Sequence, residues 1–233
     1  MKNLWKKHVM QSLRVGLSGI VKQVVFLSLC FSSVVHAEVL TLSPDQRPDW
    51  LSRDGIVMAG SWEPLLFRIY RGGSGNYTPT AEQWAAYRHE QSPEMIAQLK
   101  ELGVNFIMTH CYKGMGLEME RESMADAVKF TRLCHDANVR VGVYCFSGAF
   151  LWEPFFKEVP QARDWLILNK EGKPRIPEWK GSEYRYFWDR NNPDAQAFFR
   201  NILRFAVEDI KADLIHFDNY RVGPGSEANS VKR

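Results

Sequence analysis

The stretch Asp213-Leu-Ile-His-Phe-Asp-Asn-Tyr220 joins a short apolar run to a cluster of polar side chains. Its apolar residues favour a buried strand, and His216, Asp218 and Asn219 stand at the carboxyl end of that strand. In parallel α/β folds the ligand site lies at this end of the sheet. The stretch therefore predicts both a parallel sheet and a polar site at the carboxyl edge of that sheet.

Helices and apolar strands alternate along most of the chain. Strands are predicted over residues 55–60, 104–108, 139–145 and 213–217, and helices over residues 93–102, 121–137 and 193–212. Residues 65–70 are predicted as a further strand or as an extension of the first one. Each main strand is a nearly continuous apolar run, which is typical of parallel strands that are covered on both faces. The order predicts the α/β class, with a parallel sheet of the (β/α) TIM-barrel type.

The number of strands predicts a barrel that is truncated after its fourth strand. A complete (β/α)₈ barrel takes about 250 residues. This chain has 233 residues, and its fourth predicted strand ends only at residue 217. We therefore expect the N-terminal half of a larger barrel, and an open sheet built from the same strands is the alternative.

Residues 1–37 have the pattern of an export signal rather than of a folded segment. Basic residues precede an apolar stretch, residues 24–35, that is too short to span a bilayer, and Val35-His-Ala37 is a small-residue cleavage site. We expect cleavage before Glu38, and an uncleaved anchor is the alternative. The prediction is an exported protein, periplasmic or extracellular, with residues 38–54 as a lead-in and residues 55–233 as the partial barrel.

The composition excludes some functions and favours others. A net charge of +3 without a clustered basic face argues against nucleic-acid binding. Aromatic residues make up 13% of the chain and include eight Trp, and such rings can serve as platforms for sugars. Cys111, Cys134 and Cys145 lack the spacing of a disulfide framework or a zinc site, so we expect buried small apolar side chains there. No metal ion and no cofactor are predicted.

Polar side chains lie at the carboxyl end of all four predicted strands or just after it, and we expect them to converge on one face. They are Glu63 after the first strand, His110 and Lys113 after the second, Tyr144 on the third, and His216, Asp218 and Asn219 on the fourth. Attack at an acetal carbon suits this set, because Asp218 can act as nucleophile while a second carboxyl group supplies the proton. Histidine and lysine can bind sugar hydroxyls and keep that carboxylate ionised. The alternatives are that Asp218 caps a turn and that His110 is a core histidine.

The polar, aromatic-rich segment 170–192 joins the third strand to the last helix. Arg185 and Trp188 lie in it and are predicted to form part of a sugar platform. The alternative is a loop that packs over the mouth of the barrel. Glu118, Glu120 and Glu122 are predicted as the solvated start of a helix.

Three segments carry a resemblance to a known family: FIMTHCYKG at 106–114, VGVYCF at 141–146 and DLIHFDN at 213–219. Together they resemble the barrel of retaining glycoside hydrolases of the α-L-fucosidase type, and related bacterial glycosyl hydrolases, over residues 55–222. The resemblance implies that Asp218 is the nucleophile, that His110 binds a sugar hydroxyl and that the acid/base follows residue 233. Cys111 stands where the fucosidase pattern has a second histidine, and Asn219 where it has glycine.

The sequence thus predicts a glycosidase that acts on oligosaccharides or glycosides, without nucleic acid and without a membrane once the signal is removed. A non-catalytic sugar-binding or decayed barrel fragment is one alternative. A metal-dependent hydrolase of another kind is the other.

Overall fold

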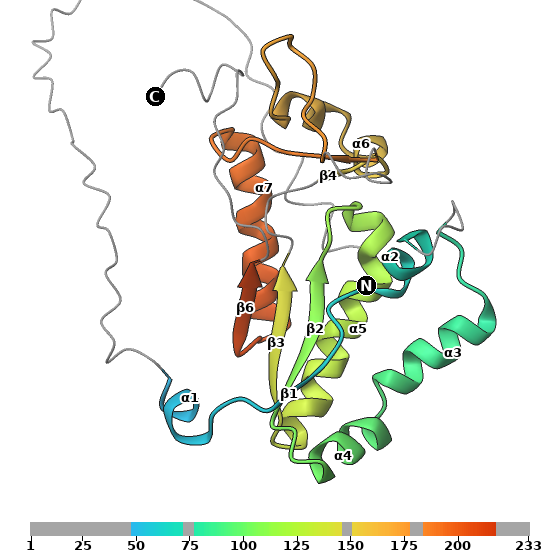
Figure 1. The fold of residues 1–233 in the computed structure, drawn as a ribbon, viewed down its shortest axis with the longest axis vertical. Helices are drawn as coiled ribbons and strands as arrows, with labels where there is room; N and C mark the ends of the chain where they lie inside the picture. Colours follow the sequence, from blue (N-terminus) through green and yellow to red (C-terminus); the bar gives the residue numbers. More distant parts are fainter. Residues whose placement is uncertain (1–47, 72–76, 146–150, 178–183, 218–233) are drawn as a thin grey trace, which may run out of the picture. The chain divides into compact units, whose positions relative to one another are not determined.

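The computed structural model describes residues 48–71, 77–145, 151–177 and 184–217. The predicted export signal and most of the lead-in lie outside these residues, as do Asp218 and Asn219. Figure 1 shows how the helices and strands of the described residues are arranged.

A sheet of four parallel strands forms the centre of the described chain (Figure 1). The strands lie in the order β1 (Met58–Gly60), β2 (Phe106–Tyr112), β3 (Arg140–Cys145) and β6 (Leu214–Phe217). The register aligns His110 with Tyr144, and Tyr144 with His216, so these side chains start at the same height in the sheet. This topology confirms the predicted α/β class with a parallel sheet.

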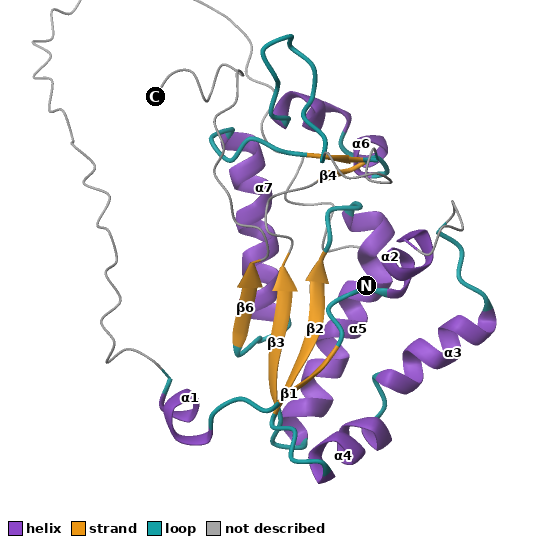
Figure 2. Cartoon of the chain, in the orientation of Figure 1, coloured by secondary structure: helices purple, strands orange, loops and turns teal. Residues whose placement is uncertain are grey.

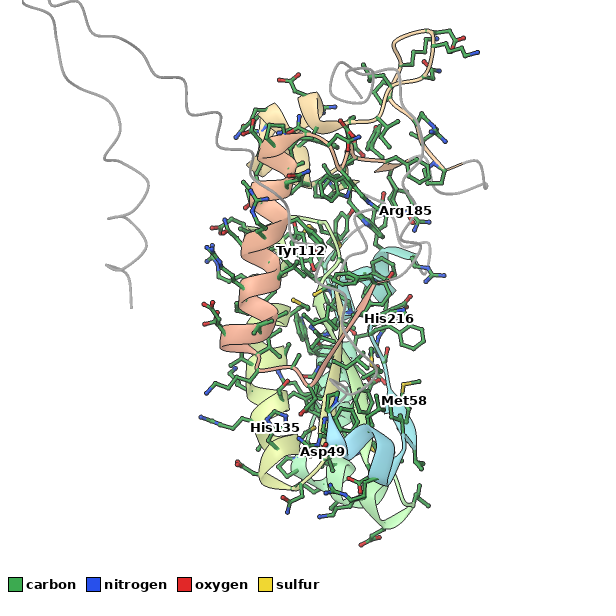
Figure 3. The ribbon with its side chains drawn as sticks, turned by 90° about the vertical axis from the view of Figure 1, so that its left-hand side faces the viewer. Asp49, Met58, Tyr112, His135, Arg185 and His216 are labelled. Atoms are coloured by element: carbon green, nitrogen blue, oxygen red, sulfur yellow. The ribbon has the colours of Figure 1, made fainter. Side chains whose placement is uncertain are left out.

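Helices connect the strands and cover the sheet (Figure 2). Before β2 come α1 (Asp49–Asp54), α2 (Leu65–Ile69), α3 (Ala81–Glu90) and α4 (Pro93–Glu101), and α5 (Leu117–Asp136) joins β2 to β3. Between β3 and β6 lie α6 (Phe155–Glu158), the 3₁₀ helix η3 (Pro160–Trp165), α7 (Pro193–Arg204) and the π-helical segment η4 (Phe205–Asp209). In Figure 3, α5 and α7 lie on one face of the sheet, while His216 and Met58 lie on the side away from α7.

The main core lies between the sheet and these helices. One face of α5 repeats apolar residues at helical spacing, Met124, Ala127 and Phe130 among them, and all three are buried. They pack with Val141 and Val143 of β3 in one continuous apolar cluster. The periodicity of α5 and the apolar runs of the strands therefore determine which face of the sheet the helices cover.

Two short antiparallel strands form a second sheet, which is not hydrogen-bonded to the main one. It joins β4 (Leu151–Trp152) to β5 (Arg185–Tyr186). A second apolar cluster forms there, in which Phe67 and Trp152 pack with ring centroids 4.7 Å apart. This cluster brings α2 and the β4–β5 pair together, although they are far apart in the sequence.

Two local predictions are wrong. Residues 65–70, expected as a strand, begin with helix α2, because Pro64 takes an extended conformation at the N-cap and its carbonyl accepts the Arg68 backbone N–H at 3.1 Å. A short apolar run does not distinguish strand from helix by its pattern. Glu120, expected on a solvated helix start, is fully buried, whereas Glu118 and Glu122 are exposed.

Candidate active site at the carboxyl ends of the strands

Four strands deliver aromatic and basic side chains to the carboxyl edge of the sheet. Trp62 follows β1, Lys113 follows β2, Tyr144 lies on β3 and His216 on β6. The rings of Trp62 and Tyr144 stack with centroids 6.4 Å apart and planes 15° apart. The Tyr144 and His216 centroids are 5.6 Å apart. We refer to these four residues as the strand-end group.

Lys113 sits between aromatic rings. Its Nζ lies 3.7 Å from the centroid of the Tyr144 ring and 4.4 Å from that of Phe67, both within the range of a cation–π interaction. The residue is 7% exposed, so it is largely removed from water. A charged donor and two flat rings therefore meet at one place.

Trp62 and His216 are the exposed members of the strand-end group. Trp62 is 42% exposed, and it follows Gly60, where the chain turns away from the sheet. A Cβ atom on Gly60 would lie 2.3 Å from the Met108 carbonyl oxygen, and φ at Gly60 is +105°, so glycine is required there. This close approach of backbones lets β1 end at that point and brings Trp62 over the neighbouring strands.

His110 is held within the protein. Its Nε2 lies 2.8 Å from the carbonyl oxygen of Ser123 on α5 and 3.3 Å from the hydroxyl of Tyr87 on α3. His110 is 1% exposed, and burial lowers its pKa to about 4, which keeps the ring neutral near pH 7. A neutral ring that donates to the Ser123 carbonyl accounts for the shorter contact.

Glu63 is engaged in an ion pair. Its Oε1 accepts a hydrogen bond from Arg71 Nη1, and its carbonyl oxygen accepts one from Arg68 Nε at 2.9 Å. The Arg71 guanidinium in turn lies 5.5 Å from the Phe67 ring centroid. Glu63 is therefore positioned beside the second apolar cluster by two arginines.

The two predicted platform residues go to different places. The Arg185 guanidinium carbon lies 5.4 Å from the ring centroids of both Trp152 and Tyr184, in the second apolar cluster (Figure 3). Burial lowers the Arg185 pKa, and Arg71 adds to this effect. Trp188 is 4% exposed and packs against Phe199 of α7 at 5.8 Å, within the main core.

Three residues in or beside the strand-end group were not predicted as site residues. Trp62 and Phe67 supply rings, and Glu120 accepts hydrogen bonds from the loop that carries Lys113. An aromatic residue two positions after a strand end is a usable signal for Trp62. The pattern gives no comparable signal for Glu120, since its helical neighbours Glu118 and Glu122 are exposed.

A cavity of about 300 Å³ lies elsewhere, beside α4 and the start of the chain's turn after β1. Leu99, Ile107 and Phe130 line it, and these residues belong to the core on the helix side. Gly60, Ser61 and Arg68 also line it, so the cavity reaches the turn that leads to Trp62, but none of the four residues of the strand-end group lines it.

Among the described side chains, no three His, Cys, Asp or Glu residues gather as ligands for a metal ion. Cys111, Cys134 and Cys145 are buried, and their thiols are free. None of the helices in the described ranges is long and apolar enough to cross a membrane.

No protein-family model matches the chain, and no curated protein sequence matches it. Solved structures give distant matches. An alpha-galactosidase from Lactobacillus brevis is 15% identical, over 69% of this chain and 20% of its own length, with a TM-score of 0.46. The maltogenic alpha-amylase AmyB from Thermotoga neapolitana is 14% identical, over 70% of this chain and 38% of its own length, with a TM-score of 0.47.

An alpha-L-fucosidase from Paenibacillus thiaminolyticus is also similar, at 15% identity over 60% of this chain and 22% of its own length, with a TM-score of 0.46. These neighbours are glycoside hydrolases. The chain spans 20% to 38% of the length of these three structures. The fucosidase, the galactosidase and the amylase match this chain at similar identity, 14% to 15%. The finer resemblance to the fucosidase type therefore stays a prediction.

Proposed function

We propose that this chain binds glycosides at the carboxyl edge of its sheet and takes part in the hydrolysis of O-glycosidic bonds. The observation that carries the proposal is the stacked pair of Trp62 and Tyr144 with the Lys113 ammonium 3.7 Å from the Tyr144 ring centroid. Flat aromatic faces with a few convergent polar groups are typical of small-molecule sites. A sugar ring presents apolar C–H groups to such a face and hydroxyl groups to a nearby cation.

Asp218 is the proposed nucleophile. It directly follows β6 in the sequence, and it lies outside the described residues. In the proposed retaining mechanism, its carboxylate attacks the anomeric carbon while the bond to the leaving oxygen breaks and a second carboxyl group protonates that oxygen. Water then attacks the glycosyl ester, the second carboxylate takes its proton, and Asp218 is released. The Lys113 ammonium, at the end of β2 on the same edge of the sheet, would favour the ionised form of Asp218.

A sugar-binding role without turnover is the second candidate. It is favoured by the contacts of two carboxyl groups near the strand ends, because other groups of the protein already occupy both of them. Glu63 is paired with Arg71, and Glu120 is buried and bonded to backbone N–H groups. Neither of them is placed as a free proton donor. The second candidate keeps the aromatic and lysine contacts and lacks catalysis.

The variant Asp218→Asn separates the two candidates. We expect the unmodified chain to hydrolyse one or more members of a panel of aryl glycosides, and the variant to lose activity by about 10⁴-fold while still binding the same sugar. Trp62→Ala should weaken sugar binding both in the unmodified chain and in the Asp218→Asn variant. Trp50→Ala, which removes a half-buried Trp stacked on Phe106 instead, serves as its control. Binding by the unmodified chain without hydrolysis at any pH favours the second candidate, and no binding by any protein rejects both.

We also propose that residues 1–37 direct export and are removed. Their basic start, short apolar stretch and small-residue cleavage site support this. Mass spectrometry of the mature protein should place its first residue at Glu38. A chain that retains Met1 in the cell membrane would support the anchor instead.

A further inference from the structure

The loop that carries Lys113 is held by one buried carboxylate. Oε2 of Glu120 accepts the backbone N–H of Lys113 at 2.7 Å, and Oε1 accepts that of Met115 at 2.7 Å. Both oxygens are thus used on the segment 113–116, which runs from the end of β2 to the start of α5. The Gly114 carbonyl accepts the Trp152 backbone N–H at 3.0 Å, which fixes the same loop to β4.

The shape of this loop requires glycine at two positions. Gly114 has φ of +95° and Gly116 has φ of +123°, and both values lie in the region that side chains disfavour. A Cβ atom on Gly116 would also meet Oε2 of Glu158 at 2.6 Å. The turn brings the backbone N–H groups of Lys113 and Met115 toward one point, where an anion is favoured. Glu120 supplies that anion from the first turn of α5.

We propose that Glu120 is a positioning residue, whose carboxylate holds the loop 113–116 and thereby keeps the Lys113 ammonium over the Tyr144 ring. This inference rests on the proposed function, in which Lys113 binds the glycoside. The backbone of Lys113 is bonded to Glu120, and its Nζ lies in the aromatic contact with Tyr144. One residue therefore links the buried carboxylate to the strand-end group.

Glu120 is a titratable group that is buried in the protein. The residue is 0% exposed, and burial raises its pKa to about 7, although the N–H groups of Met115 and Lys113 act in the opposite direction. Several titratable groups face it: Lys113 from the loop, Cys111 and Tyr112 from β2, and Glu158 from α6 beside Gly116. Strongly shifted pKa values of this kind concentrate at functional sites.

The charge state of Glu120 should determine how firmly the loop 113–116 is held in one conformation. The ionised carboxylate accepts both N–H groups, whereas the protonated form has an O–H in place of one acceptor. One backbone N–H then loses its partner in a buried place, which is costly. We therefore expect glycoside affinity to fall as the pH drops through about 7, the pKa of Glu120.

The test compares Glu120→Gln with Glu122→Gln, its control on the same helix. Glu122 is exposed and pairs with Arg88 at 3.3 Å, away from the loop. Glu120→Gln keeps the shape and removes one acceptor, so we expect roughly tenfold weaker binding of the aryl glycoside and loss of the pH step near 7. Glu122→Gln should keep both the affinity and the step. An unchanged affinity and pH step in Glu120→Gln would overturn the proposal.

A double variant checks that the effect passes through Lys113. Lys113→Met should weaken binding, and adding Glu120→Gln to it should have little further effect, because the ammonium is already gone. Additive losses would show that Glu120 acts by another route and would overturn the proposal.

Amide hydrogen exchange separates this inference from the proposed function. Exchange at the N–H groups of Lys113 and Met115 should accelerate in Glu120→Gln and not in Glu122→Gln, whether or not a glycoside binds. If no protein binds a glycoside, the proposed function fails, and the exchange rates still decide whether Glu120 holds the loop. Unchanged exchange at both N–H groups rejects that role.

Discussion

At the residue scale, Asp213 shows how one side chain fixes the start of a strand. Its Oδ2 accepts the Val141 backbone N–H at 2.8 Å and lies 2.8 Å from His135 Nε2, and its Oδ1 accepts Arg140 Nη1 at 3.0 Å. These contacts join β6 to β3 and to the last turn of α5. The carboxylate thus closes the amino edge of the sheet, opposite the strand-end group.

The stability of the protein should depend on pH through Asp213. Burial alone raises its pKa, but the hydrogen bonds from Val141, His135 and Arg140 outweigh burial, and the net pKa lies below the ordinary value. A lowered pKa in the folded state stabilises the protein above the unfolded pKa of about 4, and this stabilisation is lost as the pH falls through the folded value. Asp213→Asn should therefore reduce the free energy of unfolding by about 1–3 kcal/mol at pH 7 and by less at pH 3.

Denaturant unfolding at both pH values measures this difference. Asp209→Asn, at an exposed position on η4, is the control and should change little at either pH. Equal losses for Asp213→Asn at pH 7 and pH 3 would contradict the role of the ionised carboxylate.

At the element scale, α3 forms without an apolar face. In this helix Tyr87 alone is fully buried, so hydrophobic periodicity gave no signal and residues 81–90 were not predicted as a helix. Its start is marked by a capping box instead. The Thr80 side chain accepts the Gln83 backbone N–H at 3.2 Å, and the Gln83 side chain accepts the Thr80 backbone N–H at 2.8 Å. Local hydrogen bonding therefore determines this element more than burial does.

Removal of the cap should destabilise the protein. Thr80→Ala deletes the acceptor for the Gln83 N–H, and we expect a loss of about 1 kcal/mol in the free energy of unfolding. Thr80→Ser keeps a hydroxyl at the same place and should retain most of the stability. Thermal and denaturant unfolding of the two variants give the comparison. A loss of the same size in both variants would mean that the Thr80 methyl group, rather than the cap, matters.

The other elements differ in how far their sequences specify them. The helix 93–102 and the strand 213–217 were predicted close to their observed bounds, since Pro at the helix start and an apolar strand are strong local signals. The helix α5 begins at Leu117 rather than at residue 121, because Glu120 turns inward to meet the loop before it. Such a contact depends on two segments at once, and a pattern along one segment does not contain it.

At the scale of the whole molecule, parallel pairing explains why part of the site could be predicted. Parallel strands place their carboxyl ends at one edge, so Lys113, Tyr144 and His216 were expected together, and the ring contacts among them follow from the register. Trp188 went to the core instead of a sugar platform, since its position depends on packing against α7. Topology could be predicted from the strand and helix order, whereas side-chain placement across separate segments could not.

The two outer strands of the described sheet also predict how copies of the protein interact. On β1, Met58 is 55% exposed, and on β6, Phe217 is 38% exposed. Exposed apolar edge strands pair with other chains, and a charge on the edge opposes this. Met58→Lys should therefore reduce concentration-dependent association, as measured by light scattering or sedimentation. The control is Leu102→Lys, because Leu102 is 78% exposed but lies at the end of α4 rather than on the sheet. If both variants reduce association equally, general surface hydrophobicity and not the strand edge drives it.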